Sequence, residues 1–182
     1  QRRNLDLWAE YADGKVTKEE LNRQRYLYPL EAVGAGDSTL AKAYERDALA
    51  MIPTKSKLMP HAREVLEYLS GKYNLYILSN GFKELQSHKM RSSGIDEYFK
   101  KVVLSDDIGI LKPWPEIFHF ALSTTQSELN NSLMIGDSWE NDIVGAAGVG
   151  MHQVFYNLSG RTDLPFAPTY QITDLKDLFN FL

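Results

Sequence analysis

The feature that most constrains the fold is an alternation of short apolar segments and longer helical patterns after Pro53. The short segments are typical of buried strands and lie at residues 75–78, 101–104, 132–135 and 153–156. Patterns with helical periodicity lie at residues 62–70, 82–92, 116–123, 140–147 and 175–181. Strands separated by helical stretches indicate a parallel sheet with helices on both faces. Ligands bind such sheets beyond the carboxyl ends of the strands, so the residues that follow each strand are the first candidates for a functional site.

Composition places these elements in a globular chain and excludes several classes of protein. The chain has 182 residues, 43% of them hydrophobic, and its 20 basic and 24 acidic residues leave a net charge of −4. It contains no cysteine, which excludes disulfides, thiol catalysis and cysteine metal sites. The longest uncharged run of apolar and glycine residues, Ile143 to Met151, is far shorter than the ~20 residues that cross a bilayer. Without a cluster of Lys and Arg, a nucleic-acid polymer is not expected as a partner.

The residues before Pro53 contain helical patterns only. These patterns cover residues 5–11, 18–28 and 40–52. Thr17 and Glu20 have the spacing of a capping box at the start of the second helix, and Asp37 or Ser38 can cap the third. The sequence therefore predicts a small helical domain over residues 1–53 and an α/β domain over residues 54–182.

The first candidate site follows the strand at residues 75–78, where the sequence reads Ser79-Asn80-Gly81. A hydroxyl, a short amide and a glycine at a strand-to-helix turn can offer hydrogen-bond donors to an anion, and the start of the next helix adds a partial positive charge. The same three residue types are also common in turns that bind nothing.

The second candidate follows the strand at residues 101–104 and centres on Lys112-Pro113. The residue before a proline avoids helical geometry, so the lysine lies in an extended and stiffened segment. A fixed ammonium is suited to the charge of a phosphoryl group. The alternative is a surface lysine in the lead-in to a helix.

The third candidate follows the strand at residues 132–135 and begins Gly136-Asp137-Ser138. Asp137 and Asp142 flank a strand-to-helix turn, where both carboxylates can face the strand ends and supply the hard oxygen ligands that suit Mg²⁺. The alternative assigns Asp137 or Ser138 to helix capping and Asp142 to the first helical turn.

Taken in chain order, these three segments resemble the second, third and fourth motifs of the haloacid dehalogenase (HAD) superfamily. The resemblance extends from about Pro53 to Leu182, and the helices before Pro53 look like the inserted cap of that superfamily. The segment from Ile77 to Phe82, the Lys112-Pro113 context and the turn Gly14-Lys15-Val16-Thr17 look most like the pyrimidine 5'-nucleotidase branch of HAD phosphatases.

The resemblance implies an α/β fold: a three-layer Rossmann-like core with a parallel sheet and a helical cap inserted after the first strand. In this family an aspartate at the end of that strand is the nucleophile, and a second aspartate two residues later is the general acid and base. The present sequence contains no Asp-x-Asp motif. We therefore expect that residues preceding Gln1 are missing, and with them the first strand, which belongs in the middle of the sheet between the strands at 75–78 and 132–135.

The resemblance also gives each candidate residue a role. Asp137 would ligate Mg²⁺ together with a carboxylate of the missing motif. Ser79, with the backbone amides around Asn80 and Gly81, would bind the phosphoryl oxygens. Lys112 would pair with the phosphoryl group and the nucleophile. Asp142 would hold Lys112 or support the metal.

The expected function is hydrolysis of a small phosphorylated metabolite, most specifically a nucleoside monophosphate, by a Mg²⁺-dependent enzyme that forms an aspartyl-phosphate. One alternative is a metal-independent 2-haloacid dehalogenase, whose family also uses a Ser-Asn turn and a lysine. Another is a HAD-like binding protein without catalysis, if the Asp-x-Asp motif is truly absent. We expect a cytoplasmic monomer or homodimer with no membrane partner.

Overall fold

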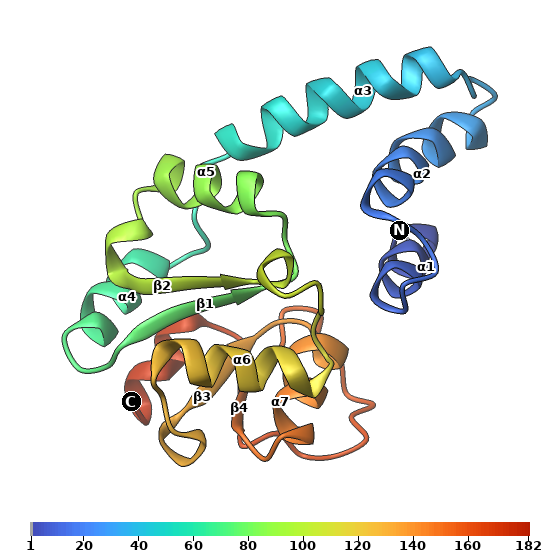
Figure 1. Cartoon of the computed structure of the whole chain (residues 1–182). Coiled ribbons are helices and arrows are strands. Elements are labelled where there is room, and N and C mark those ends of the chain that lie inside the picture. Colours follow the sequence, from blue (N-terminus) through green and yellow to red (C-terminus); the bar gives the residue numbers. More distant parts are fainter. Residues whose placement is uncertain (1) are drawn as a thin grey trace. The chain divides into compact units, whose positions relative to one another are not determined.

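The computed structural model describes residues 2–182, without the side chains of Arg2 and Glu84. The chain divides into two compact units, the first ending at Lys55 and the second running from Ser56 to Leu182 (Figure 1). The units are described separately below. The sequence places the boundary at Pro53, close to this division.

The first unit is helical and consists of α1 (Arg2–Ala12), α2 (Lys18–Ala32) and α3 (Ser38–Met51). Thr17 caps α2, because its side-chain oxygen accepts a hydrogen bond from the backbone N–H of Glu20 at 3.2 Å. The Glu20 carboxylate does not complete the predicted capping box; it accepts instead from the side chains of Arg23 and Gln24. Asp37 caps α3 through the N–H of Thr39 and Leu40.

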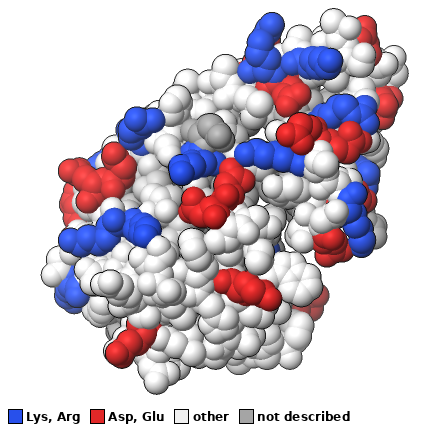
Figure 2. Space-filling model, in the orientation of Figure 1, with Lys and Arg blue, Asp and Glu red and all other residues white. Residues whose placement is uncertain are grey.

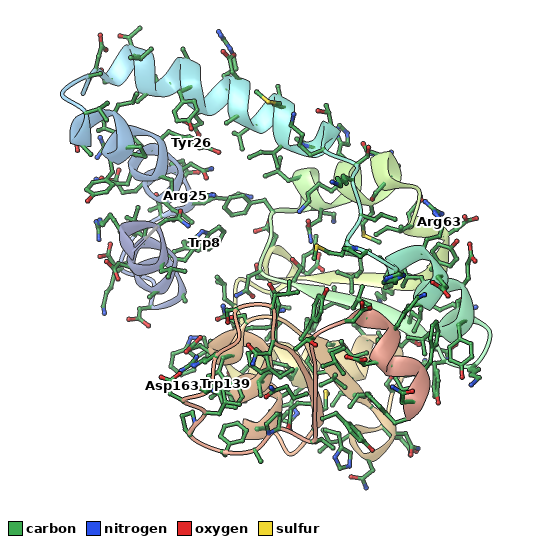
Figure 3. All side chains as sticks on the ribbon, turned by 180° about the vertical axis from the view of Figure 1, so that it is seen from behind. Trp8, Arg25, Tyr26, Arg63, Trp139 and Asp163 are labelled. Atoms are coloured by element: carbon green, nitrogen blue, oxygen red, sulfur yellow. The ribbon has the colours of Figure 1, made fainter. Side chains whose placement is uncertain are left out.

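Aromatic and apolar side chains form the interior of the helical unit. Leu7, Leu21, Tyr26 and Ala41 are buried. The Arg25 guanidinium lies 5.1 Å from the ring centre of Trp8 and 5.8 Å from that of Tyr26, and the three side chains lie near one another in Figure 3. Cation–π contacts of this kind add to the burial of the rings. Burial also raises the pKa of Tyr26.

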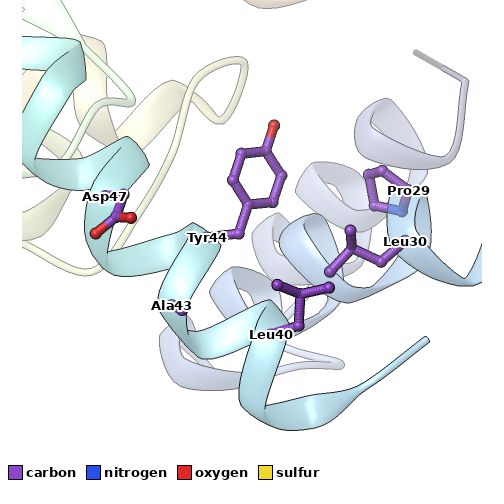
Figure 4. A pocket seen from close by; sticks show the side chains of 6 residues that line it. All are labelled: Pro29, Leu30, Leu40, Ala43, Tyr44 and Asp47. Atoms are coloured by element: carbon purple, nitrogen blue, oxygen red, sulfur yellow. The ribbon is translucent and has the colours of Figure 1, made fainter. Parts of the chain in front are cut away.

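Helices α2 and α3 enclose a shallow apolar pocket of about 480 Å³ (Figure 4). Its lining consists of Pro29, Leu30, Leu40, Ala43, Tyr44 and Asp47. Leu40 and Tyr44 are each about half exposed (47% and 48%), so this helix pair leaves part of its apolar surface uncovered within the unit.

The second unit alternates strands and helices. Its strands are β1 (Leu75–Ser79), β2 (Phe99–Leu104), β3 (Leu133–Gly136), β4 (His152–Tyr156) and β5 (Tyr170–Ile172). Its α-helices are α4 (Ala62–Ser70), α5 (Lys83–Ser93), α6 (Pro115–Thr125) and α7 (Gly145–Gly148). A π-helical segment, η5 (Trp139–Val144), leads into α7. Short 3-10 helices are η2 (Asp96–Tyr98), η3 (Ser105–Asp107), η4 (Leu129–Asn131) and η6 (Leu175–Asn180). One more, η1 (Ile52–Thr54), lies at the boundary of the two units in the sequence.

Every strand pairing in the described chain is parallel, as the alternation predicts: β1 pairs with β2, β3 with β4, and β4 with β5. The four predicted strands are present. Strand β5 was missed because three residues are too few to show periodicity. The predicted C-terminal helix is the 3-10 segment η6.

Helices cover both faces of the sheet. In β3, Leu133 and Ile135 contact one core cluster, built from α4, β4, β5 and η6, whereas Met134 contacts another, built mainly from α6 and α7. In β4, Val154 and Phe155 likewise belong to different clusters. Successive side chains of a strand point to opposite faces, so two apolar faces require cover on both sides. The result is the predicted three-layer α/β core.

The sheet is interrupted between β1 and β3. Within residues 2–182, β1 pairs only with β2 and β3 pairs only with β4, so that the strands form a two-stranded and a three-stranded sheet. A cavity of about 1180 Å³ is lined by residues of both strands, among them Leu75, Ile77, Leu133 and Ile135. Each of these two strands therefore has one partner strand and borders the same apolar cavity.

Candidate functional site

The structure brings together residues from three of the four predicted strand ends. Ser79 ends β1, Lys112 lies in the segment between β2 and α6, and Asp142 lies in η5 after β3. The Lys112 Nζ atom donates to the backbone oxygen of Leu78 at 2.7 Å and to Asp142 Oδ1 at 2.6 Å. Residues separated by 30 and 34 positions thus meet at one sheet edge, as expected for the carboxyl ends of parallel strands.

Lys112 and Asp142 form a buried ion pair. Their side chains are 9% and 7% exposed. A lysine ammonium has three N–H donors, and two of them are engaged with Leu78 and Asp142. In the described part of the chain the third donor has no partner, which leaves one hydrogen bond and a positive charge available to an anion.

The Asn80 side chain holds the backbone of Lys112. Its Nδ2 donates to the Lys112 carbonyl at 2.9 Å, and its Oδ1 accepts from the Lys112 N–H at 2.8 Å. The Asn80 side-chain amide therefore pairs with the Lys112 backbone as a neighbouring strand would. It joins the turn after β1 to the segment that carries Lys112. Phosphate binding by Asn80 remains a prediction, and only its backbone N–H is left for it, since both ends of the side chain are engaged.

The Ser79 hydroxyl accepts two hydrogen bonds. One comes from the backbone N–H of Gly81 at 3.0 Å and the other from Nε2 of Gln86 at 2.9 Å. Gln86 was not among the residues predicted from sequence. The available signal was its position in the first turn of the helix after Ser79, from which a long side chain can reach back to the strand end.

Asp142 is fixed by its own loop as well as by Lys112. Its Oδ2 accepts from the backbone N–H of Ser138 at 3.0 Å, and the Ser138 hydroxyl accepts from the N–H of Asn141 at 3.3 Å, which makes Ser138 the helix cap. A Cβ added at Gly136 would lie 2.3 Å from Asp142 Oδ2. The glycine that ends β3 is therefore required to leave room for this carboxylate.

Asp137 is exposed and differs from Asp142 in its surroundings. Both oxygens of Asp142 are engaged by protein donors, so this residue fits the role of holding Lys112 better than that of a metal ligand. No side-chain hydrogen bond or ion pair engages Asp137 within residues 2–182, and a carboxylate at a strand end fits Mg²⁺ as one oxygen ligand. The described residues contain no group of three or more candidate ligands, so further oxygen donors are needed to complete a metal site.

Trp139 connects this loop to the long connection after β4. Its buried ring lies 5.2 Å from Phe155 and 4.9 Å from Phe166, and the Arg161 guanidinium lies 5.6 Å from it. Arg161 also pairs with Glu140 at 2.7 Å. Arg161 also pairs with Asp163 of the same connection at 3.4 Å, and Figure 3 labels both Trp139 and Asp163. Phe155, Arg161 and Phe166 thus pack against Trp139 and stabilise the segment that carries Asp137 and Asp142.

The surface carries charge of both signs. On the face shown in Figure 2, Lys and Arg side chains are interspersed with Asp and Glu. Of the described helices, none combines the length and the apolar character that crossing a membrane requires.

Comparison with known proteins agrees with this geometry. Residues 4–150 match the haloacid dehalogenase-like hydrolase family. The chain belongs to this family. The predicted resemblance and the predicted α/β fold are therefore confirmed, and this HAD protein is a hydrolase.

Two relatives of this HAD hydrolase support the assignment at the level of sequence. YfnB of Bacillus subtilis, named as a HAD-hydrolase, is 30% identical over 98% of the chain and 76% of its own length. Pyrimidine 5'-nucleotidase YjjG of Escherichia coli is 30% identical over 98% of the chain and 79% of its own length.

Solved structures agree. A crystal structure of YfnB bound to magnesium has a TM-score of 0.87 with 29% identity and covers 98% of this chain and 78% of its own. A 2-haloacid dehalogenase from Pseudomonas syringae pv. Tomato DC3000 has a TM-score of 0.69 with 26% identity and covers 98% and 76%. The proteins similar to this chain thus include a nucleotidase and a dehalogenase.

Proposed function

We propose that the protein is a magnesium-dependent phosphatase that hydrolyses a small phosphomonoester through an aspartyl-phosphate, with nucleoside monophosphates as the expected substrates. The buried Lys112–Asp142 pair beside Ser79 carries this proposal. An ammonium with one unengaged N–H, shielded from water, stabilises an anion more strongly than an exposed one. Membership of the hydrolase family supports it, as do relatives named as pyrimidine 5'-nucleotidases and phosphoserine phosphatase.

Each residue of the site has a distinct task in this proposal. Lys112 binds a phosphoryl oxygen through its third N–H and reduces the repulsion between the phosphate and an attacking carboxylate. Ser79 donates its hydroxyl proton to a second phosphoryl oxygen, and the backbone N–H of Asn80 is available to a third. Gly81 contributes by holding Ser79 through its N–H. Asp142 holds the Lys112 ammonium in place through its Oδ1.

Asp137 is the proposed protein ligand of Mg²⁺ in this chain. When bound, the metal neutralises phosphate charge and orients the group for in-line attack. The magnesium in the YfnB crystal structure supports this cofactor. Asp137 contributes an exposed carboxylate at the end of β3, next to the segment that positions Asp142.

The nucleophile is proposed to enter on a further strand with an Asp-x-Asp motif. The apolar cavity that β1 and β3 share, and the lack of pairing between these strands in the described residues, support a strand at this position. A strand there would pair with both and deliver its terminal aspartates to the edge where Ser79, Lys112 and Asp137 lie. The helical unit is proposed to be the cap of this enzyme, acting on substrate as a monomer or homodimer.

The test uses a form of the protein that carries the Asp-x-Asp strand. Phosphate release is measured over a panel of phosphomonoesters that includes pyrimidine and purine nucleoside monophosphates, with Mg²⁺ and with EDTA. We expect hydrolysis of at least one nucleoside monophosphate and its loss in EDTA. No phosphate release from any substrate would contradict the proposal.

A 2-haloacid dehalogenase is the second candidate, because such an enzyme is among the solved structures of similar fold. Halide release from 2-chloropropionate that persists in EDTA would favour it, since those enzymes need no metal. If the protein has no Asp-x-Asp strand and neither activity is found, the third candidate, a HAD-like binding protein, remains. The relatives named as pyrimidine 5'-nucleotidases and the magnesium in the YfnB crystal structure favour the phosphatase over both.

A further inference from the structure

Two hydrogen bonds hold the Ser79 hydroxyl in a defined orientation. A hydroxyl has two acceptor lone pairs and one donor proton. Both acceptor positions of Ser79 are filled, by the Gly81 N–H at 3.0 Å and by the Gln86 side-chain amide at 2.9 Å. The proton of Ser79 is then left to donate to some other group.

From this we infer that Gln86 is a positioning residue that keeps the Ser79 hydroxyl pointing its proton at the phosphoryl group. Without Gln86, one lone pair of Ser79 is unoccupied, and the hydroxyl can rotate or donate to a neighbouring carbonyl. The inference rests on the proposed function, because it deepens the role given there to Ser79.

The surroundings of Gln86 are built for this contact. Gln86 lies in the first turn of α5, whose first N–H, that of Lys83, donates to Asp106 Oδ2 at 3.2 Å. The helix start is thereby tied to the end of β2. A Cβ added at Gly81 would lie 3.0 Å from Gln86 Cγ and 3.2 Å from Ser79 Oγ. The glycine therefore leaves the space through which the glutamine side chain reaches the serine.

Two substitutions separate donation from packing. Gln86→Met keeps a long unbranched side chain and removes the amide donor. Gln86→Glu presents a carboxylate, which accepts a hydrogen bond from Ser79 and turns its proton away from the substrate. His88→Gln, at an exposed position of the same helix, is the control. Each variant is made in the form of the protein that carries the Asp-x-Asp strand.

The measurements are kcat and KM for a nucleoside monophosphate at saturating Mg²⁺, with the melting temperature of every variant. A hydrogen bond to a charged group contributes about 1.5–3 kcal/mol, so Gln86→Met should lower kcat by about 10- to 150-fold. KM should change by less than about 3-fold because the bond strengthens as charge develops. Gln86→Glu should lower kcat more than Gln86→Met does, and His88→Gln should have the kcat and KM of the parent protein.

A double-substitution cycle decides whether Gln86 acts through Ser79. In a Ser79→Ala background, Gln86→Met should cost less than about 2-fold in kcat, since its only proposed route is gone. The inference is overturned if Gln86→Met or Gln86→Glu keeps the parental kcat, or if the loss is equally large in the Ser79→Ala background. If the parent protein itself releases no phosphate, the proposed function fails and this inference fails with it.

Discussion

The buried Lys112–Asp142 pair provides the sharpest test of the site's energetics. Replacing Asp142 with Asn removes the only carboxylate bonded to Lys112 in the described structure and leaves a buried ammonium. At the 2.6 Å separation of the two atoms, Coulomb attraction is about 6 kcal/mol for an effective dielectric constant of about 20. Lys112 keeps its bond to the Leu78 carbonyl, so the net loss should be smaller. We expect about 3–5 kcal/mol, the usual cost of removing one partner from a buried pair.

Urea unfolding of chain 1–182, followed by circular dichroism, measures this loss as a decrease in the free energy of unfolding. Thermal unfolding measures it as a decrease in melting temperature. The melting temperature should fall by roughly 10 °C for about 4 kcal/mol in a chain of this size. The matched control is Asp47→Asn, because Asp47 pairs with Arg46 at 2.8 Å but the two side chains are 62% and 75% exposed. That exposed pair should contribute no more than about 1 kcal/mol.

The pair should also show strong coupling. Lys112→Met alone leaves the Asp142 carboxylate buried with the Ser138 N–H as its remaining bond. The double variant Lys112→Met with Asp142→Leu removes both charges and should cost at least about 2 kcal/mol less than the sum of the single variants. Additive losses, or a loss for Asp142→Asn as small as that for Asp47→Asn, would refute the reasoning.

Three further predictions test other parts of the structure. Gly136→Ala should destabilise the protein by about 2–3 kcal/mol, since the new Cβ would lie 2.3 Å from Asp142 Oδ2; a melting temperature equal to that of the parent contradicts the close approach. In a Trp8→Phe, Trp114→Phe background, where Trp139 is the remaining tryptophan, Arg161→Ala should cost about 1 kcal/mol and increase quenching of Trp139 fluorescence by acrylamide; unchanged quenching would show that Arg161 does not shield Trp139. Burial raises the pKa of Tyr26, so its contribution to stability is present below the ordinary tyrosine pKa and is lost as pH rises through the raised value. In carbon-13 NMR of the tyrosine rings, the Tyr26 signal of the folded protein should titrate at a higher pH than the Tyr26 signal of the urea-unfolded chain. Equal titration midpoints in the two states would contradict this.

Much of the α/β unit could be predicted because its signals are local. Short apolar runs in the sequence indicate buried strands. Polar residues and glycines such as Ser79-Asn80-Gly81 and Gly136-Asp137 indicate the turns at their ends. The rule that parallel strands end at one edge then brings these motifs together without knowledge of any distance. Strand β5 and the 3-10 geometry of η6 escaped prediction because short elements take their conformation from the neighbours they pair with.

The partners of the site residues could not be predicted, because hydrogen bonds across long sequence separations leave no periodic trace. The sequence predicts phosphate binding at Asn80, but it does not show that both ends of the Asn80 side chain bind the backbone of Lys112, thirty-two residues away. Gln86 looked like an ordinary helical residue, and its contact with Ser79 depends on the exact direction in which α5 leaves the turn.

By itself, the sequence determined the class of fold, the order of its motifs and the family, since these depend on residue types and on spacing along the chain. The tertiary structure alone decided which donors are engaged and which are left for a ligand. It engages both oxygens of Asp142 and leaves those of Asp137 open, although the two carboxylates are only five residues apart. The physical reason is burial. A carboxylate shielded from water must be paired inside the protein, whereas an exposed carboxylate is hydrated and is open to a metal ion.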